Sequence, residues 1–347
     1  MKKTFRVMFI TMIVSMSAGA AHASDAESAA AVSPYATLDV ARDDKTGAVT
    51  LVLSTHGKTG GDTTLRRTVA DGVEQWEKFN KWYEDLFGLT YLDSDYKRLW
   101  SQLRKRGATF AKYFVNEEML KALDGCKLLV VIDEKYPFPA DTFRFGDKWL
   151  FEIVPIVHSL SAGAKDLTDS TDYKSALVID CQGPKDREGR EAPDVYADLG
   201  KIPNVKSKLI LSLKRDETVK NLESNPADVL HLATHAEPDE FFPGRNHPGI
   251  KATELAEMKL PFRMVLSTGC NTGNPVFAGG ILHGETKFMI ASMYITSGKD
   301  GVIFGKEFYP MLFAGKTPFE AFYAVKQRIT GNKSDFPDIL RFAFFVK

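Results

Sequence analysis

Residues 263–273 read RMVLSTGCNTG, and the interpretation of the whole chain starts from this stretch. An apolar run typical of a buried strand ends in small polar residues, and Cys270 follows directly. Residues 228–240, DVLHLATHAEPDE, have the same form and present His235 after their own apolar run. In open α/β sheets, ligands bind beyond the carboxyl ends of the strands. The two stretches therefore predict an imidazole and a thiol facing each other at one edge of a sheet.

The stretches before and after these two contain further apolar runs of the same kind. Short apolar runs alternate with helical segments from residue 127 onward, and this alternation is typical of a mostly parallel sheet with helices on both faces. The expected fold class is thus α/β, a three-layer α/β/α sandwich. The predicted strands are KLLVVID (127–133), WLFEIVPIV (149–157), SALVIDC (175–181), SKLILSL (207–213), DVLHLAT (228–234), RMVLST (263–268) and FMIASMYI (288–295).

The amino-terminal part of the chain divides into two expected segments ahead of the main domain. Residues 1–23 combine basic residues, an apolar core and a small-x-small end, which predicts a signal peptide and a periplasmic or secreted bacterial protein. Residues 24–71 form an extension with a β-hairpin turned at 44–47. Residues 72–347 form the main domain, and its first part, 72–125, has helical periodicity.

Composition excludes several classes of function. Without its predicted signal the chain has 42 Lys and Arg (45 minus Lys2, Lys3 and Arg6) against 45 Asp and Glu, a net charge of −3. This balance gives no indication of a nucleic-acid binder. No stretch after the signal is apolar enough to span a membrane. No Cys/His spacing suggests a metal site, and no phosphate or dinucleotide motif is present. The sequence therefore gives no sign of a metal or nucleotide cofactor, and the oligomeric state stays unassigned.

The His235 and Cys270 pair has a definite chemical use. A cysteine thiol has an unperturbed pKa near ~8.5, so it is mostly protonated at neutral pH. A neighbouring histidine can take the proton and stabilise the thiolate nucleophile. Backbone N–H groups in the turns after the two strands could bind the oxyanion of a tetrahedral intermediate.

Other histidines and cysteines have simpler interpretations. His56 also follows an apolar strand, but it lies in the amino-terminal β element outside the main alternation. His231 falls within a strand and is expected in the core, and His247 and His283 are expected at the surface. Three cysteines allow at most one disulfide, for which Cys181 and Cys270 are the candidates. Otherwise Cys126 and Cys181 are buried apolar residues.

Several of these stretches together resemble the CHAT domain, a branch of the caspase-like cysteine peptidases. The resemblance covers roughly 75–347 and implies a caspase-like α/β/α fold, with His235 as general base and Cys270 as nucleophile of peptide hydrolysis. The backbone N–H groups of residue 236 and Cys270 would then form the oxyanion hole. The stretches similar to the family pattern are KLLVVIDEKYPFPADTFRF (127–145), LFEIVPIVHSLSA (150–162), DVLHLATHAEPDEF (228–241), ATELAEMKLPFRMVLSTGCNTG (252–273) and KEFYPMLFAGKTPFEAFYAVKQRI (306–329).

Two residues depart from the family pattern. Ala236 stands where the family has glycine, and alanine does not readily adopt a positive φ. MYITSGKDG (293–301) keeps Asp300 of a Trp-x-x-x-Asp stretch but lacks the tryptophan. These departures leave open an inactive caspase-like module that binds a protein partner, or a hydrolase that is not a peptidase. If Asp300 or the acids at 237–240 line the substrate pocket, a basic residue before the cleaved bond is expected.

Overall fold

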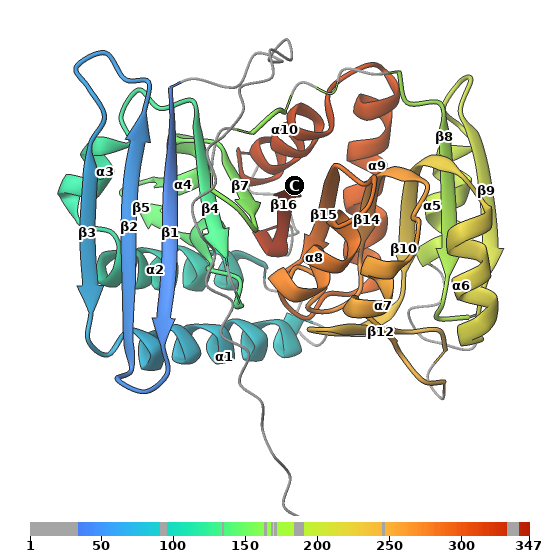
Figure 1. Cartoon of the computed structure of the whole chain (residues 1–347), viewed down its shortest axis with the longest axis horizontal. Helices are drawn as coiled ribbons and strands as arrows, with labels where there is room; N and C mark the ends of the chain where they lie inside the picture. Colours follow the sequence, from blue (N-terminus) through green and yellow to red (C-terminus); the bar gives the residue numbers. More distant parts are fainter. Residues whose placement is uncertain are drawn as a thin grey trace, which may run out of the picture.

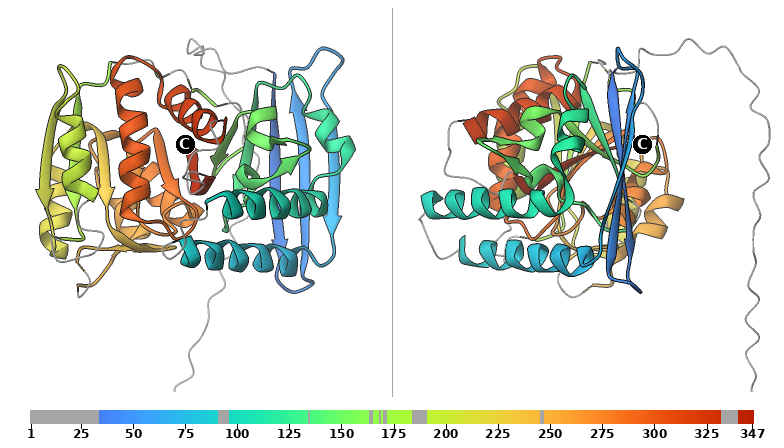
Figure 2. Two further views of the ribbon diagram at one scale, coloured as in Figure 1. Left: turned by 180° about the vertical axis from the view of Figure 1, so that it is seen from behind. Right: turned by 90° about the vertical axis from the view of Figure 1, so that its left-hand side faces the viewer.

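A single eleven-stranded sheet organises the chain, in the order β3-β2-β1-β4-β7-β16-β15-β14-β10-β8-β9 (Figures 1 and 2). The predicted α/β class with a large, mostly parallel sheet flanked by helices is confirmed. The predicted signal peptide lies outside the described residues. The structure is a computed structural model that describes residues 34–90, 96–133, 135–162, 165–167, 169, 172–183, 191–244, 247–331 and 340–347.

The carboxyl-terminal half of the sheet contains five strands that all pair in parallel. Mostly apolar runs form the four inner strands because a parallel strand covered on both faces has no side exposed to water, whereas β9 at the edge of the sheet is partly exposed. All residues of β15 are buried, as are five of the six residues of β14. The five strands are β8 (Ser175–Asp180), β9 (Lys206–Leu211), β10 (Ala227–Ala233), β14 (Phe262–Ser267) and β15 (Phe288–Ser292).

The amino-terminal half contains the predicted hairpin and two strands parallel to its first strand. The hairpin turns between Asp43 and Ala48, and Gly47 adopts a φ of 77° there. Its first strand pairs in parallel with β4, so the amino-terminal strands continue the main sheet. The five strands are β1 (Tyr35–Asp43), β2 (Ala48–His56), β3 (Thr64–Val69), β4 (Leu128–Asp133) and β7 (Ile156–Ser159).

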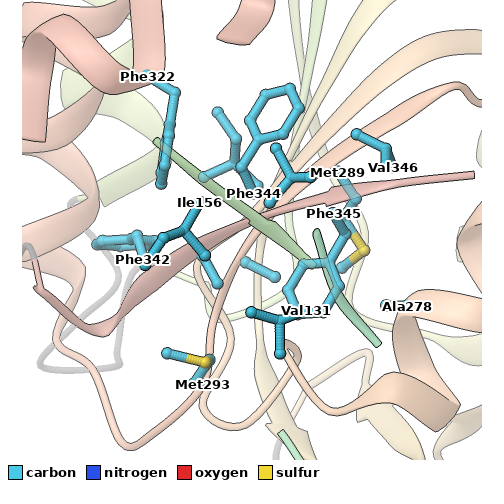
Figure 3. Close-up of a cluster of buried hydrophobic side chains, with 14 of the residues drawn as sticks. Val131, Ile156, Ala278, Met289, Met293, Phe322, Phe342, Phe344, Phe345 and Val346 are labelled. Atoms are coloured by element: carbon cyan, nitrogen blue, oxygen red, sulfur yellow. The ribbon is translucent and has the colours of Figure 1, made fainter. Parts of the chain in front are cut away.

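Strand β16 (Phe342–Val346) joins the two halves of the sheet. It pairs antiparallel with β15 over five residues and parallel with β7 over two residues. All five of its residues are buried, and aromatic rings project from both of its faces (Figure 3). Phe344 contacts the rings of Phe319 and Phe322 of α10, while Phe345 lies 5.3 Å from the ring of His158.

Helices cover both faces of the sheet (Figures 1 and 2). α5, α9 and α10 lie on one face together with α1 and α2, and α6, α7 and α8 lie on the other. The helices are α1 (Gly72–Thr90), α2 (Tyr96–Phe114), α3 (Glu117–Ala122), α4 (Leu150–Ile153), α5 (Glu191–Leu199), α6 (Arg215–Ser224), α7 (Ala252–Glu257), α8 (Pro275–Leu282), α9 (Gly298–Phe313) and α10 (Pro318–Gly331), with a 3₁₀ turn, η1 (Ala140–Thr142). Short pairings add β5 (Arg144–Phe145), β6 (Lys148–Trp149), β11 (His235–Glu237), β12 (Glu240–Phe242) and β13 (Ile250–Lys251).

Two elements differ from the sequence-based expectation. The strand predicted at 149–157 is wrong in its first part, because residues 150–153 form the short helix α4 and only the end of the run enters β7. Both buried helices and buried strands are apolar throughout, so this run did not distinguish them. Strand β16 was not predicted, although its sequence FAFFV is as apolar as the strands that were.

A buried ionic network ties the amino-terminal half to α10. His158 Nδ1 lies 2.5 Å from Asp133 Oδ2, and His158 Nε2 lies 2.7 Å from Asp141 Oδ2. Lys326 of α10 bonds the other oxygen of Asp141. All four side chains are at most 2% exposed. Burial alone would lower the pKa of His158, but the two carboxylates outweigh it and raise the pKa to about 9.

Replacing His158 by glutamine should reduce stability in a pH-dependent way. A histidine whose pKa is raised on folding stabilises the fold fully below its unfolded pKa of 6.5, and this contribution is lost as pH rises through about 9. The difference in unfolding free energy between wild type and His158→Gln should therefore shrink by about 3 kcal/mol from pH 6.5 to above pH 9. Urea unfolding across this range measures it. A difference that stays constant with pH would contradict an imidazolium at this position.

Candidate active site

The pairing of β10 with β14 brings the two predicted reactive segments to one edge of the sheet. Leu232 of β10 is the partner of Ser267 of β14 in a parallel register. His235 and Cys270 each follow three residues later along their own segments. The register continues one step beyond β14, since Thr268 N donates to Leu232 O at 3.2 Å. Both residues are half-buried.

Gly269 allows these two segments to approach closely. A Cβ atom at this position would lie 2.9 Å from Ala236 Cβ, 2.9 Å from Thr234 Cγ2 and 3.0 Å from Thr272 Cγ2. The backbone just before Cys270 therefore packs against the residues on both sides of His235. Only glycine gives this contact without displacing a neighbour, because the atoms in the way are short side chains with no freedom to withdraw.

The loop that follows Cys270 is fixed to the end of β15. Asn271 N donates to Tyr294 O at 3.1 Å, and Gly273 N donates to Ser292 O at 2.7 Å. Asn271 has a φ of 59°, a left-handed conformation that asparagine tolerates better than most residues. Tyr294 is itself held by its hydroxyl, which donates to Asn80 Oδ1 of α1 at 3.1 Å. Sequence reasoning missed Tyr294, which falls inside the strand predicted at 288–295 but follows the end of β15 in the structure.

The Cys270 thiol lies beside the start of α9. Its Sγ donates to the carbonyl oxygen of Thr296 at 3.6 Å. Ser297 follows as the N-cap of α9 and accepts from Asp300 N at 3.3 Å. The first turn of a helix presents a positive dipole end and favours a nearby negative charge such as a thiolate. Thr296 was also missed by the sequence, since a backbone carbonyl leaves no mark on side-chain patterns.

Strand β10 ends at Ala233, and His235 is the first residue of β11. His231, four residues earlier, contacts Glu191 of α5 and Tyr309 of α9, with its ring nitrogens 3.1 and 2.7 Å from their oxygens. Thr234 and Ala236, on either side of His235, both lie next to Gly269. His231 itself is fully buried, which confirms its prediction as a core residue.

The backbone at Ala236 is extended, so the missing glycine causes no strain. Ala236 lies in β11 and pairs with Phe241 of β12. Positive φ values among the described residues other than glycine occur only at Asn204 and Asn271. Its methyl group occupies space that a side chain at residue 269 would need. Alanine at 236 and glycine at 269 are therefore complementary in size.

Asp300 has a role in capping α9. Its Oδ2 accepts from Ser297 N at 3.0 Å and from Ser297 Oγ at 2.9 Å, and it lies 3.8 Å from Arg341 Nη1. The residue is 7% exposed. This geometry gives no support to the predicted pocket role, which stays a prediction. Glu237, at the end of β11, and Asp239, in the turn between β11 and β12, are exposed.

The remaining histidines lie away from this edge. His56 stacks on Tyr35 at 4.6 Å at the end of β2, seven positions from β10 in the sheet order. His247 and His283 are exposed, as predicted. Within the described ranges, no group of three or more His, Cys, Asp or Glu side chains could hold a metal ion. No helix there has the length and apolar character needed to cross a membrane.

The two other cysteines are buried apolar residues, as the simpler interpretation predicted. Burial raises the pKa of the Cys126 thiol and of the Cys181 thiol. No disulfide joins any of the three cysteines, all of which belong to the described part of the chain. The Cys181–Cys270 pairing considered from the sequence does not form in this structure.

Comparisons with known proteins relate this chain to others through its structure. No protein-family model matches the sequence, and no curated protein matches it. Two crystal structures of the Saccharomyces cerevisiae separase–securin complex match with TM-scores of 0.54 and 0.55 and 9% identity. Each match covers 90% of this chain and 30% of the other, so this chain spans under a third of that chain's length. The arrangement of sheet and helices is the caspase-like one.

A complex of the pro- and mature domains of Porphyromonas gingivalis RgpB also matches. Its TM-score is 0.46 at 11% identity, and the match covers 67% of this chain and 69% of that chain. Because the sequence identity to separase is only 9%, this structural match establishes the fold alone.

Replacing Gly269 by alanine should destabilise the protein by about 1–3 kcal/mol, because three side chains crowd the new methyl group. Adding Ala236→Gly should restore part of this loss, since one of the three contacts disappears. Urea unfolding of the single and double variants measures both effects. Gly284→Ala is the matched control, because its nearest contact would be an ordinary 3.8 Å. Equal stability of Gly269→Ala and wild type would contradict the close approach of the two segments.

Proposed function

We propose that this chain is a cysteine peptidase in which His235 is the general base and Cys270 is the nucleophile. The observation that carries the proposal is the β10–β14 register, with Gly269 packed against both neighbours of His235. The caspase-like fold supports it, because the structural neighbours are caspase-like cysteine peptidases. The structural match to these neighbours concerns the fold only. The proposed catalytic roles therefore depend on the residues at this edge of the sheet.

The proposed reaction begins with transfer of the thiol proton to His235. In the resting geometry the thiol donates to the Thr296 carbonyl. The thiolate then attacks the carbonyl carbon of a peptide bond, and the imidazolium returns the proton to the leaving amine. Water, activated by the same imidazole, hydrolyses the resulting thioester and regenerates the thiol. The imidazole of His235 accepts and returns every proton that the thiol, the leaving amine and the water exchange. The cycle therefore needs no cofactor.

The oxyanion would be stabilised by the backbone N–H groups of Ala236 and Cys270. A well-directed N–H donor in such a site contributes roughly 3–4 kcal/mol to transition-state stabilisation. The extended backbone at Ala236 supports this assignment, because the alanine has the same N–H group as the family's glycine and needs no positive φ. The departure at residue 236 is thus compatible with an active enzyme.

We further propose that the protein acts outside the cytoplasm after removal of residues 1–23. The basis is the sequence of this segment alone. Protein recovered from the periplasmic fraction or the medium should begin near Ser24 by amino-terminal sequencing. A retained leader on protein found only in the cytoplasm would contradict export.

Labelling with iodoacetamide should distinguish Cys270 from the other two thiols. Burial and raised pKa values slow Cys126 and Cys181, whereas a half-buried, base-assisted Cys270 should be alkylated first near pH 7. His235→Ala should slow labelling of Cys270 about tenfold at this pH, because an unassisted thiol is only a few per cent ionised. Peptide mass spectrometry across pH 6–9 measures the three rates.

His283→Ala is the matched control, since it removes an exposed histidine from another part of the surface. Cleavage of an unfolded protein substrate should be lost in Cys270→Ala and in His235→Ala but not in this control. Slow labelling of all three thiols at equal rates, with no cleavage, would instead identify an inactive caspase-like module that binds a protein partner.

A further inference from the structure

Helix α2 (Tyr96–Phe114) has an unusual charge composition. Its 19 residues include six basic residues and no acidic residue. Most of its large apolar side chains, among them Leu99, Leu103, Phe110 and Phe114, are buried in the core, whereas Tyr113 is exposed. Four of the basic side chains therefore occupy the opposite side of the helix, which lies at the outside of the molecule (Figure 2). We name Arg104, Lys105, Arg106 and Lys112 the α2 basic face.

The cations of the α2 basic face have no carboxylate partner in the described part of the chain. On the neighbouring helix α1, by contrast, Lys78 is paired with Glu74 one turn away. A helix with no acid on it cannot form such intrahelical pairs. Lys105 and Lys112, seven residues apart, follow one line along the helix, with Arg104 and Arg106 on either side of Lys105. Positive charge is therefore concentrated along about two turns.

Tryptophan rings hold the arginines of this surface in place. The Arg104 guanidinium lies 5.8 Å from the Trp100 ring centroid, and that of Arg106 lies 5.6 Å from the Trp82 ring. Arg144, next to α2, lies 5.8 Å from the Trp149 ring. Burial and the nearby Arg104 guanidinium lower the pKa of Arg144. Guanidinium groups that are already oriented lose less conformational freedom when they bind an anion.

We propose that the α2 basic face is a docking surface for an acidic polypeptide segment. Guanidinium groups pair with carboxylates through two parallel hydrogen bonds, so oriented arginines suit a carboxylate-rich chain. Single-stranded nucleic acid would need several exposed rings for base stacking, but the arginines cover Trp82 and Trp100, and Tyr113 is a single exposed ring beside them. A lipid surface would need several apolar side chains to insert, and among the described residues of α2 only Tyr113 is a large exposed one. This proposal does not depend on the peptidase assignment.

Binding of a fluorescein-labelled oligoglutamate peptide, followed by fluorescence anisotropy, tests this proposal. The folded wild type should bind the peptide, and binding should weaken as salt is added. The variant Lys105→Gln, Arg106→Gln, Lys112→Gln should bind about tenfold more weakly, because three exposed charge pairs are lost. Glutamine is a good helix former, so α2 should remain folded, and thermal unfolding checks this directly.

The matched control is the variant Lys220→Gln, Lys259→Gln, Lys316→Gln, which removes the same charge from three exposed sites elsewhere. It should bind within about twofold of wild type. Equal losses in both triple variants would show a response to net charge alone and would overturn the proposal. Absence of peptide binding, or tighter binding to single-stranded DNA or to phosphatidylglycerol vesicles than to the peptide, would overturn it as well.

Discussion

The placement of β16 between β7 and β15 is the constraint on which the rest of the structure depends. Without this strand the five parallel strands of one half and the five strands of the other would present two open edges. Each of its residues is buried, and its phenylalanines fill the space beneath helices on one face and beside His158 on the other. Burial of large aromatic side chains is among the strongest local contributions to stability, roughly 1.5–3 kcal/mol each. One short strand thereby makes two halves into one sheet.

Ionic contacts inside the protein reinforce this junction and extend to the candidate site. The network of Asp133, His158, Asp141 and Lys326 crosses between the amino-terminal half and α10, the helix that precedes β16. At the start of β16, Arg341 bonds the Ile295 carbonyl and lies near Asp300. Buried charges are tolerated only where they are paired, so these contacts specify which elements meet. The same contacts hold the loop whose Thr296 carbonyl receives the Cys270 thiol.

The candidate site depends on small residues as much as on reactive ones. Gly269 lets the Cys270 segment approach the His235 segment, and Ala236 fills the space that results. Tyr294 links the loop after Cys270 to Asn80 of α1. Because α1 packs against α2, the edge with the proposed dyad and the α2 basic face belong to one continuous framework. An acidic segment docked on α2 would be held on the same molecule as the edge proposed to cleave peptides.

The sequence by itself determined the alternation of strands and helices, the hairpin at 44–47 and the positions of His235 and Cys270 after two strands. These features follow from local periodicity and from turn residues, which act over a few neighbouring positions. Only the tertiary structure decided that β16 lies between two distant strands, that 150–153 is helical, and that residue 236 needs no glycine. Each of these depends on contacts between segments far apart in the chain, and a local pattern has no means of recording them.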